Sequence, residues 1–166
     1  MPREHHLEGQ AQMTVTTIAQ EVVLRVYGIP GPQGSKTISR WGGVRESSAK
    51  VGPWRSEVAY TARQTYKGDP ITDPVAVDIT FYFPRPKGHY GTGRNAEKLK
   101  ASAPKHCTSC ANGDLDKLVR STFDSLAVRS GGSVISDDSQ VVELLCNKRY
   151  ASATEPPGAL VRIRIA

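Results

Sequence analysis

One segment, Val75 to Phe83, constrains the fold of this chain more than any other. Most of its residues are β-branched, aromatic or small and apolar, and Pro84 and Pro86 close it. Such a run is typical of a β-strand, because branched and aromatic side chains pack well on a pleated sheet. A chain of 166 residues is long enough to bury a core around that strand, so we expect one globular domain without disulfide or metal staples.

The other apolar runs predict strands and helices around this central strand. Strands are expected at 22–28, 134–135, 141–150 and 160–165, and helices at 53–66 and 114–127. This order predicts an α+β domain: a small mixed β-sheet with two main helices packed on one face. Residues 1–20 are polar and lack a hydrophobic period, so we expect a flexible tail before a single domain at 21–166.

The chain is basic, with a formal net charge of +6 and a pI of about 9.4. Two segments concentrate this charge: a basic loop or loose hairpin at 34–52 and a long loop at 84–112. A positive surface favours polyanions, because each neutralised phosphate releases condensed counterions. We therefore predict that these segments and the helix at 114–127 contact nucleic-acid phosphates, through Lys36, Arg40, Lys98, Lys100, Lys105 and Lys117. A merely solvated loop is the alternative for 84–112.

Composition excludes some classes of protein and indicates a compartment. No window reaches the 18 or more apolar residues that a membrane span needs, and the N-terminus has no apolar signal region. Three cysteines cannot all pair within one chain, which favours a reducing compartment inside a cell over a disulfide framework. Cys107 and Cys110 follow His106, but one Cys-x-x-Cys without a second ligand pair is weak evidence for zinc. Incidental loop cysteines are the preferred interpretation.

The segment from Gly113 to Leu126 carries the most chemistry. On a helix, its apolar residues gather in one stripe that faces the core. Asp116 lies at the edge of that stripe, with Arg120 and Asp124 following at four-residue steps on the same side. A local interpretation is available, in which Asp114 caps the helix and Asp116 forms an ion pair with Arg120.

A second acidic cluster, Asp137-Asp138, follows downstream in a turn between two strands. Neighbouring residues on an extended chain point to opposite faces, so at most one of the two joins Asp114 and Asp116 easily. Three such carboxylates would form the oxygen-rich ligand set that Mg²⁺ or Mn²⁺ prefers. Because they would repel one another without a cation, the pattern favours a metal site over surface decoration.

These acids stand in an order that resembles the RusA family of Holliday junction resolvases. The resemblance rests on Asp-Leu-Asp-Lys-Leu-Val-Arg from Asp114, Phe-Asp-Ser-Leu from Phe123 and Ser-Asp-Asp-Ser-Gln-Val-Val from Ser136. A weaker similarity lies in the Pro- and Lys-containing turn that runs from Gly28 to Lys36. The resemblance implies an α+β RusA-like fold, a homodimer, and hydrolysis of four-way junctions or other branched DNA with Mg²⁺ or Mn²⁺.

Carried over residue by residue, the resemblance places the metal ligands at Asp114, Asp116 and Asp138. The lysine that is catalytic in the family falls on Arg120, which is a departure. An arginine neutralises phosphate charge but is a poor proton donor, since its pKa is very high. Lys117 stands where some family members have Asn. Arg120 or Lys117 is therefore expected to offset the charge that grows on the phosphoryl oxygens.

Three further functions remain open from the sequence. The first is a structure-selective nuclease for flaps or replication forks, and the second is a non-catalytic DNA-binding protein whose acids are structural. The third is a basic phage accessory protein that contacts another protein. The three acids argue against the second, because a protein that only binds DNA gains nothing from carboxylates that face phosphates.

Overall fold

The computed structural model describes residues 21–34, 36–38, 44–46 and 49–166. A four-stranded mixed sheet forms its centre, in the order β1–β6–β4–β5. The strands are β1 (Glu21–Tyr27), β6 (Gly158–Ile165), β4 (Val75–Phe83) and β5 (Val141–Tyr150). β6 runs antiparallel to both β1 and β4, whereas β4 and β5 are parallel. The predicted α+β class and mixed sheet are confirmed.

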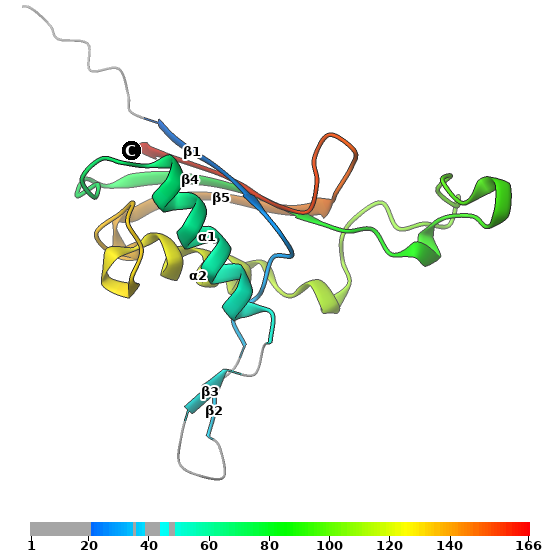
Figure 1. Cartoon of the computed structure of the whole chain (residues 1–166), viewed down its shortest axis with the longest axis horizontal. Helices are drawn as coiled ribbons and strands as arrows, with labels where there is room; N and C mark the ends of the chain where they lie inside the picture. Colours follow the sequence, from blue (N-terminus) through cyan, green and yellow to red (C-terminus); the bar gives the residue numbers. More distant parts are fainter. Residues whose placement is uncertain (1–20, 35, 39–43, 47–48) are drawn as a thin grey trace, which may run out of the picture.

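Two helices, α1 (Val51–Thr65) and α2 (Leu115–Leu126), cover one face of this sheet (Figure 1). The odd-numbered residues of β4, which include Val77, Ile79 and Phe81, are buried in the main core cluster with residues of both helices. A chain that passes from β4 through α2 to the parallel β5 must run α2 antiparallel to both strands. The N-terminal turn of α2 therefore lies toward the end of the sheet where β4 and β5 finish.

The helices are joined to each other by a buried hydrogen bond. Trp54 of α1 is almost completely buried, and its indole Nε1 donates to Thr122 Oγ1 of α2 at 3.1 Å. The Thr122 hydroxyl in turn donates to the carbonyl of Leu118 at 2.9 Å. A buried indole N–H without an acceptor is costly, so this contact fixes how the two helices pack as well as adding stability.

Some segments differ from the expectation. Residues 134–135 form no strand; Ile135 makes only isolated bridges to Ile71 and Ala127. The basic segment at 34–52 contains β2 (Lys36–Ile38) paired antiparallel with β3 (Val44–Glu46), as the loose-hairpin interpretation had it. The predicted tail at 1–20 lies outside the described residues. Within the described ranges, no helix is long and apolar enough to cross a membrane.

The edge strand β5 exposes several large apolar side chains. Val142, Leu144 and Leu145 are 60%, 45% and 64% exposed. Only one side of β5 pairs with another strand of the described chain, so its other side presents free backbone groups. Monomeric proteins usually protect such an edge with charges, proline or a covering segment. The segment from Val141 to Asn147 contains only one charged residue, Glu143.

The Trp54–Thr122 bond gives a first prediction. Thr122→Val keeps the volume of the side chain but removes the acceptor, which leaves the Trp54 N–H buried without a partner. The free energy of unfolding should fall by about 1–3 kcal/mol, measured by chemical denaturation. The control is Thr65→Val at the exposed end of α1, which should change stability by less than about 0.5 kcal/mol. Equal stability of Thr122→Val and wild type would contradict the role of this bond.

Candidate active site

The first turn of α2 presents two carboxylates to solvent. Asp114 occupies the N-cap position with an extended backbone, but its side chain makes no capping hydrogen bond. Its carboxylate instead forms an ion pair with Lys117 Nζ at 3.0 Å, and both side chains are largely exposed. Asp116 is exposed in the same turn. The capping interpretation of Asp114 is therefore wrong for its side chain, which remains on the surface next to Asp116.

Asp116 and Arg120 project from the exposed side of α2, opposite the buried residues Leu118 and Thr122. Within the described part of the chain, neither side chain forms an ion pair or a hydrogen bond, so the expected pair between them is not made. Asp124, at the next step along this side, pairs with Arg55 of α1 at 2.6 Å. The helix thus uses Asp124 for packing and leaves Asp116 and Arg120 available for a ligand.

The turn that precedes α2 rests on the segment after β1. Gly113 has φ +77°, and a Cβ there would lie 2.5 Å from the ring of Pro32. Gln33 N donates to Lys117 O at 3.0 Å, and Ser121 Oγ donates to Gly31 O at 2.6 Å. The Pro-rich turn that resembles the RusA family therefore packs directly against the helix that carries Asp114 and Asp116. Its role in the described structure is to position that helix.

Lys148 of β5 also reaches the first turn of α2. Its Nζ donates to Gly113 O at 2.6 Å, which brings a half-buried ammonium group next to the residue that precedes Asp114. The sequence analysis did not select Lys148, because a lysine on an alternating strand carries no motif. Only the crossing of β5 under α2 identifies it as a cation at this end of the sheet.

The two acids of the second cluster have different roles. Asp137 caps the short turn η5 (Asp138–Gln140) in a capping box: its carboxylate accepts from Ser139 N at 2.9 Å, and Gln140 Oε1 accepts from Asp137 N at 2.8 Å. Arg129 Nη1 lies 3.0 Å from the same carboxylate. The bonds from Ser139, with a smaller contribution from Arg129, hold the pKa of Asp137 well below its usual range.

Asp138, in contrast, is exposed, and its carboxylate has no partner among the described residues. It is thus the member of the pair whose carboxylate remains available for a ligand, and that it binds metal stays a prediction. Asp138 lies just before β5, whereas Lys148, which contacts Gly113, lies seven residues beyond the start of that strand. At about 3.3 Å per residue, the start of β5 and Lys148 are about 23 Å apart along the strand.

One copy of the chain therefore brings Asp114 and Asp116 together but places Asp138 toward the opposite end of β5. Among the described residues, no group of three or more His, Cys, Asp or Glu side chains is arranged to hold a metal ion. That Asp114, Asp116 and Asp138 bind one metal stays a prediction. The three cysteines are free: Cys107 is buried and accepts a hydrogen bond from Asn112, Cys110 is exposed and Cys146 is half-buried.

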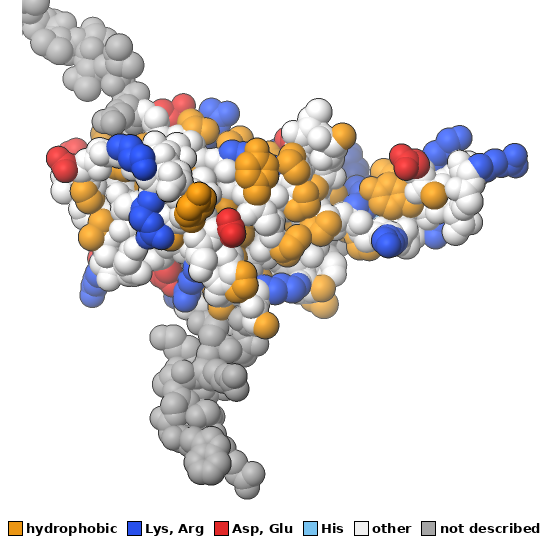
Figure 2. All heavy atoms as spheres, viewed as in Figure 1, with side chains coloured by type: hydrophobic (Ala, Val, Ile, Leu, Met, Phe, Trp, Pro, Cys, Tyr) orange, Lys and Arg blue, Asp and Glu red, His pale blue; other side chains and the backbone are white. Residues whose placement is uncertain are grey.

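The long segment at 84–112 is an ordered arm that extends from the sheet (Figure 1). Its base is held where the guanidinium of Arg85 stacks 3.9 Å from the centre of the Tyr150 ring and donates to Pro104 O at 2.8 Å. Farther out, a bridge between Tyr90 and Leu99 closes it. Figure 2 shows blue Lys and Arg side chains clustered at its tip.

Of the residues predicted to contact DNA, Lys98, Lys100 and Lys105 lie exposed on this arm. Lys100 Nζ donates to Gly88 O at 2.9 Å, so it also helps to hold the arm together. Lys36 begins β2, but its side chain is not described, and Arg40 lies outside the described residues. The arm contains the short helices η1 (Lys87–His89), η2 (Gly93–Asn95) and η3 (Cys110–Asn112), and most of its residues are exposed, so its contact with DNA stays a prediction.

The fold and the site together consist of a small mixed sheet, exposed carboxylates at the start of a helix, and a basic arm. A family model described as "Endodeoxyribonuclease RusA" matches residues 28–164. The chain therefore belongs to the RusA endodeoxyribonuclease family, which confirms the resemblance drawn from the acids.

Two relatives match over most of their length. YqaN of Bacillus subtilis, an uncharacterized protein, is 33% identical over 141 residues, which cover 84% of this chain and 92% of the relative. The crossover junction endodeoxyribonuclease RusA of Aquifex aeolicus is 24% identical over 145 residues, which cover 87% of this chain and 92% of the relative.

The different roles of the two neighbouring acids give a second prediction. Because the pKa of Asp137 is lowered by folding, its ionised form stabilises the folded state at pH values above the unfolded pKa of about 4. That contribution is lost as the pH falls below this value. Asp137→Ala should therefore be less stable than wild type at pH 7, and the difference should narrow as the pH approaches 2, measured by thermal melts across pH.

The matched control is Asp138→Ala, one residue away, whose carboxylate has no partner in the described part of the chain. It should melt like wild type across the same pH range. Equal destabilisation by the two substitutions, or a stability gap for Asp137→Ala that does not depend on pH, would refute the assignment of Asp137 to the turn and Asp138 to the site.

Proposed function

We propose that this chain is a divalent-metal-dependent endodeoxyribonuclease that resolves four-way junctions and related branched DNA by paired phosphodiester hydrolysis. Its place of action would be the cytoplasm of a bacterial cell or a phage-infected host. The observation that carries this proposal is the exposed pair Asp114 and Asp116, whose carboxylates are not needed for the fold, in a member of the RusA family. The name of the Aquifex relative supports the junction as substrate.

Asp114, Asp116 and Asp138 are the proposed metal ligands. Exposed carboxylates are a suitable donor set for Mg²⁺ or Mn²⁺, which prefer oxygen ligands. When bound, such a cation supplies an activated water and charge stabilisation at the phosphoryl oxygens. Lys117 Nζ pairs with the carboxylate of Asp114, and it would turn to a DNA phosphate when that carboxylate binds metal. Arg120 would offset negative charge on the phosphate one helical turn beyond Asp116.

The separation of Asp138 from Asp114 is explained if two copies of the chain complete each site. The apolar and unprotected edge of β5 is the surface that fits a second copy (Val142, Leu144 and Leu145). A two-fold axis that crosses β5 reverses the direction of the partner strand. Such a dimer would carry Asp138 of one copy toward the end of β5 where the partner's Lys148, Asp114 and Asp116 lie. It would also present two symmetric sites, as paired nicks in a junction require.

The primary test is cleavage of a synthetic four-way junction, with nicks mapped with and without Mg²⁺. Asp116→Asn should reduce the cleavage rate by at least about a thousandfold, since a metal ligand is lost. Junction binding in Ca²⁺ should persist or tighten, because a repulsive charge near phosphate is removed. Near wild-type cleavage by Asp116→Asn would reject the site. Cleavage of flaps or forks in preference to junctions would reject the four-way junction as the preferred substrate.

Mixing two inactive variants tests whether the sites are shared between copies. Asp116→Asn and Asp138→Asn should each be inactive alone. If each site combines Asp116 of one copy with Asp138 of the other, half of randomly mixed dimers contain one intact site, so the mixture should regain about one quarter of wild-type sites. If each chain holds a complete site of its own, the mixture stays inactive. Light scattering that finds an active monomer would also exclude the shared site.

The basic arm is tested by the salt dependence of binding. Replacing Lys98, Lys100 and Lys105 together with Ala should flatten the plot of log affinity against log salt by about one to three units, since each phosphate contact contributes a slope of roughly −0.9. The measurement is junction affinity in Ca²⁺ at several salt concentrations. The fold should survive, because these side chains are exposed. An unchanged slope would mean that the arm does not touch DNA.

A further inference from the structure

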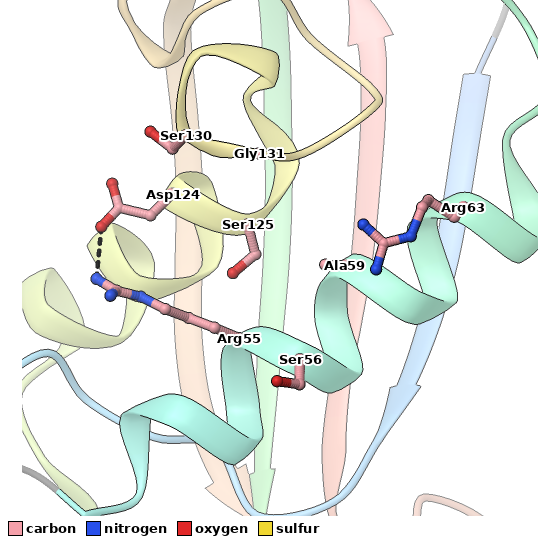
Figure 3. Close-up of a pocket in the computed structure, with 8 residues that line it drawn as sticks. All are labelled: Arg55, Ser56, Ala59, Arg63, Asp124, Ser125, Ser130 and Gly131. Carbon is pink, nitrogen blue, oxygen red and sulfur yellow. Dashed lines mark hydrogen bonds and ion pairs between the residues drawn. The ribbon is translucent and has the colours of Figure 1, made fainter.

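A polar hollow lies between α1, α2 and the short turn η4 (Val128–Ser130), away from the acids of the candidate site. It has a volume of about 380 Å³, and Figure 3 shows the side chains around it. It is lined by Arg55, Ser56, Ala59, Arg63, Asp124, Ser125, Ser130 and Gly131. Two guanidinium groups therefore face this hollow against a single carboxylate.

The two arginines differ in how they are held. Arg55 Nη2 lies 2.6 Å from Asp124 Oδ2, so that carboxylate is engaged at one side of the hollow (Figure 3). Arg63, two helical turns farther along α1, reaches toward the hollow from the other side, and no acid among the described residues pairs with its guanidinium. The hollow thus has an excess positive charge on a planar group with several N–H donors, which suits an oxyanion.

The remaining lining residues decide which groups bind. The Ser125 hydroxyl donates to the carbonyl of Ser121 at 3.0 Å, so it has no proton left for an anion. Ser56 and Ser130 are exposed at the rim, and their hydroxyls have no recorded partner in the described chain. Together with Arg63 they provide hydrogen-bond donors on more than one side of the hollow. This arrangement matches the tetrahedral oxygens of a phosphate better than a flat or apolar ligand.

The hollow and the candidate site lie along the same side of α2. Asp116, Arg120 and Asp124 follow at four-residue steps, and Asp124 lines the hollow. Eight residues of helix span about 12 Å. One strand of a duplex places a nucleotide every 3.4 Å or so along its axis. A strand that passes Asp116 therefore reaches the hollow within a few nucleotides.

We propose that this hollow binds a backbone phosphate of the DNA, a few nucleotides from the phosphodiester that is cut, with Arg63 as its main cation and Ser56 and Ser130 as supporting donors. The proposal rests on the proposed function, and it assigns these residues to hold the strand rather than to the reaction. A phosphate contact of this kind fixes register without reading sequence. It would determine which phosphodiester faces Asp114 and Asp116.

The test compares Arg63→Ala with Lys67→Ala, which removes a positive charge just beyond the end of α1, outside the hollow. Affinity is measured in Ca²⁺ on a junction and on a plain duplex, at several salt concentrations. Arg63→Ala should bind several-fold more weakly and flatten the salt slope by about one, whereas Lys67→Ala should match wild type. Arg63→Lys keeps the charge but not the planar fork, and should recover most of the slope. Melting temperatures check that each variant folds.

A free phosphate ion is the alternative ligand that the hollow could bind through the same groups. A titration of the wild-type protein with inorganic phosphate, followed by the NMR amide shifts of Ser130 and Gly131, separates the two. Weak binding of inorganic phosphate that does not saturate, together with weaker DNA binding by Arg63→Ala, supports the contact with the DNA strand. Tight phosphate binding with normal DNA affinity in Arg63→Ala would overturn it in favour of a small anion. Equal losses in Arg63→Ala and Lys67→Ala would also overturn it, as a general charge effect.

Cleavage separates this proposal from the proposed function. These affinities are measured without turnover, so a wild-type protein that binds DNA through Arg63 but cuts no junction would reject the nuclease proposal alone. If the wild type cuts junctions and Arg63→Ala shifts neither the affinity nor the position of the nicks, the phosphate contact is wrong and the nuclease proposal stands.

Discussion

The close contact between the first turn of α2 and the segment after β1 is the constraint on which the site depends. Gly113 allows the turn before α2 to approach Pro32 where a Cβ would collide, and Gly31 in the same segment lies against the carbonyl of Lys50, which precedes α1. The hydroxyl of Ser121 ties the same helix to Gly31 O. Because this contact fixes the N-terminus of α2, Asp114 and Asp116 are held at the surface without using their carboxylates for folding.

The charges of the molecule divide into those that hold the fold and those left for ligands. Asp137 forms a capping box, and Asp124 forms an ion pair with Arg55. Asp138 is next to Asp137, and Asp116 lies two helical turns before Asp124. Both carry the same carboxylate group, but neither carboxylate has a partner in the described chain. The arm follows the same logic, since stacking of Arg85 on Tyr150 anchors it and leaves its lysines exposed.

The edge strand β5 connects the architecture to the proposed chemistry. Its apolar side chains lie outward on a sheet edge, which is an unusual feature for a monomer. Its two ends carry different parts of the proposed metal site, with Asp138 at the start and Lys148 beside Gly113 near the finish. A partner strand that runs in the opposite direction would satisfy both features at once. Each complete metal site would then require the dimer.

Much of this protein could be predicted from local pattern. The β-branched run at 75–83, the amphipathic helix at 114–127 and the order of elements specify the α+β class, because side-chain periodicity directly reflects the face that each element buries. The spacing of Asp114, Asp116 and Asp138 was sufficient to indicate the family, which the family model confirms. Other features depend on contacts between residues far apart in the chain. The crossing of helices and strands, which no local spacing encodes, decided four of these features. Ile135 forms only isolated bridges, and Lys148 meets Gly113. Arg63 faces a hollow with Arg55, and Asp138 lies far along β5 from Asp114.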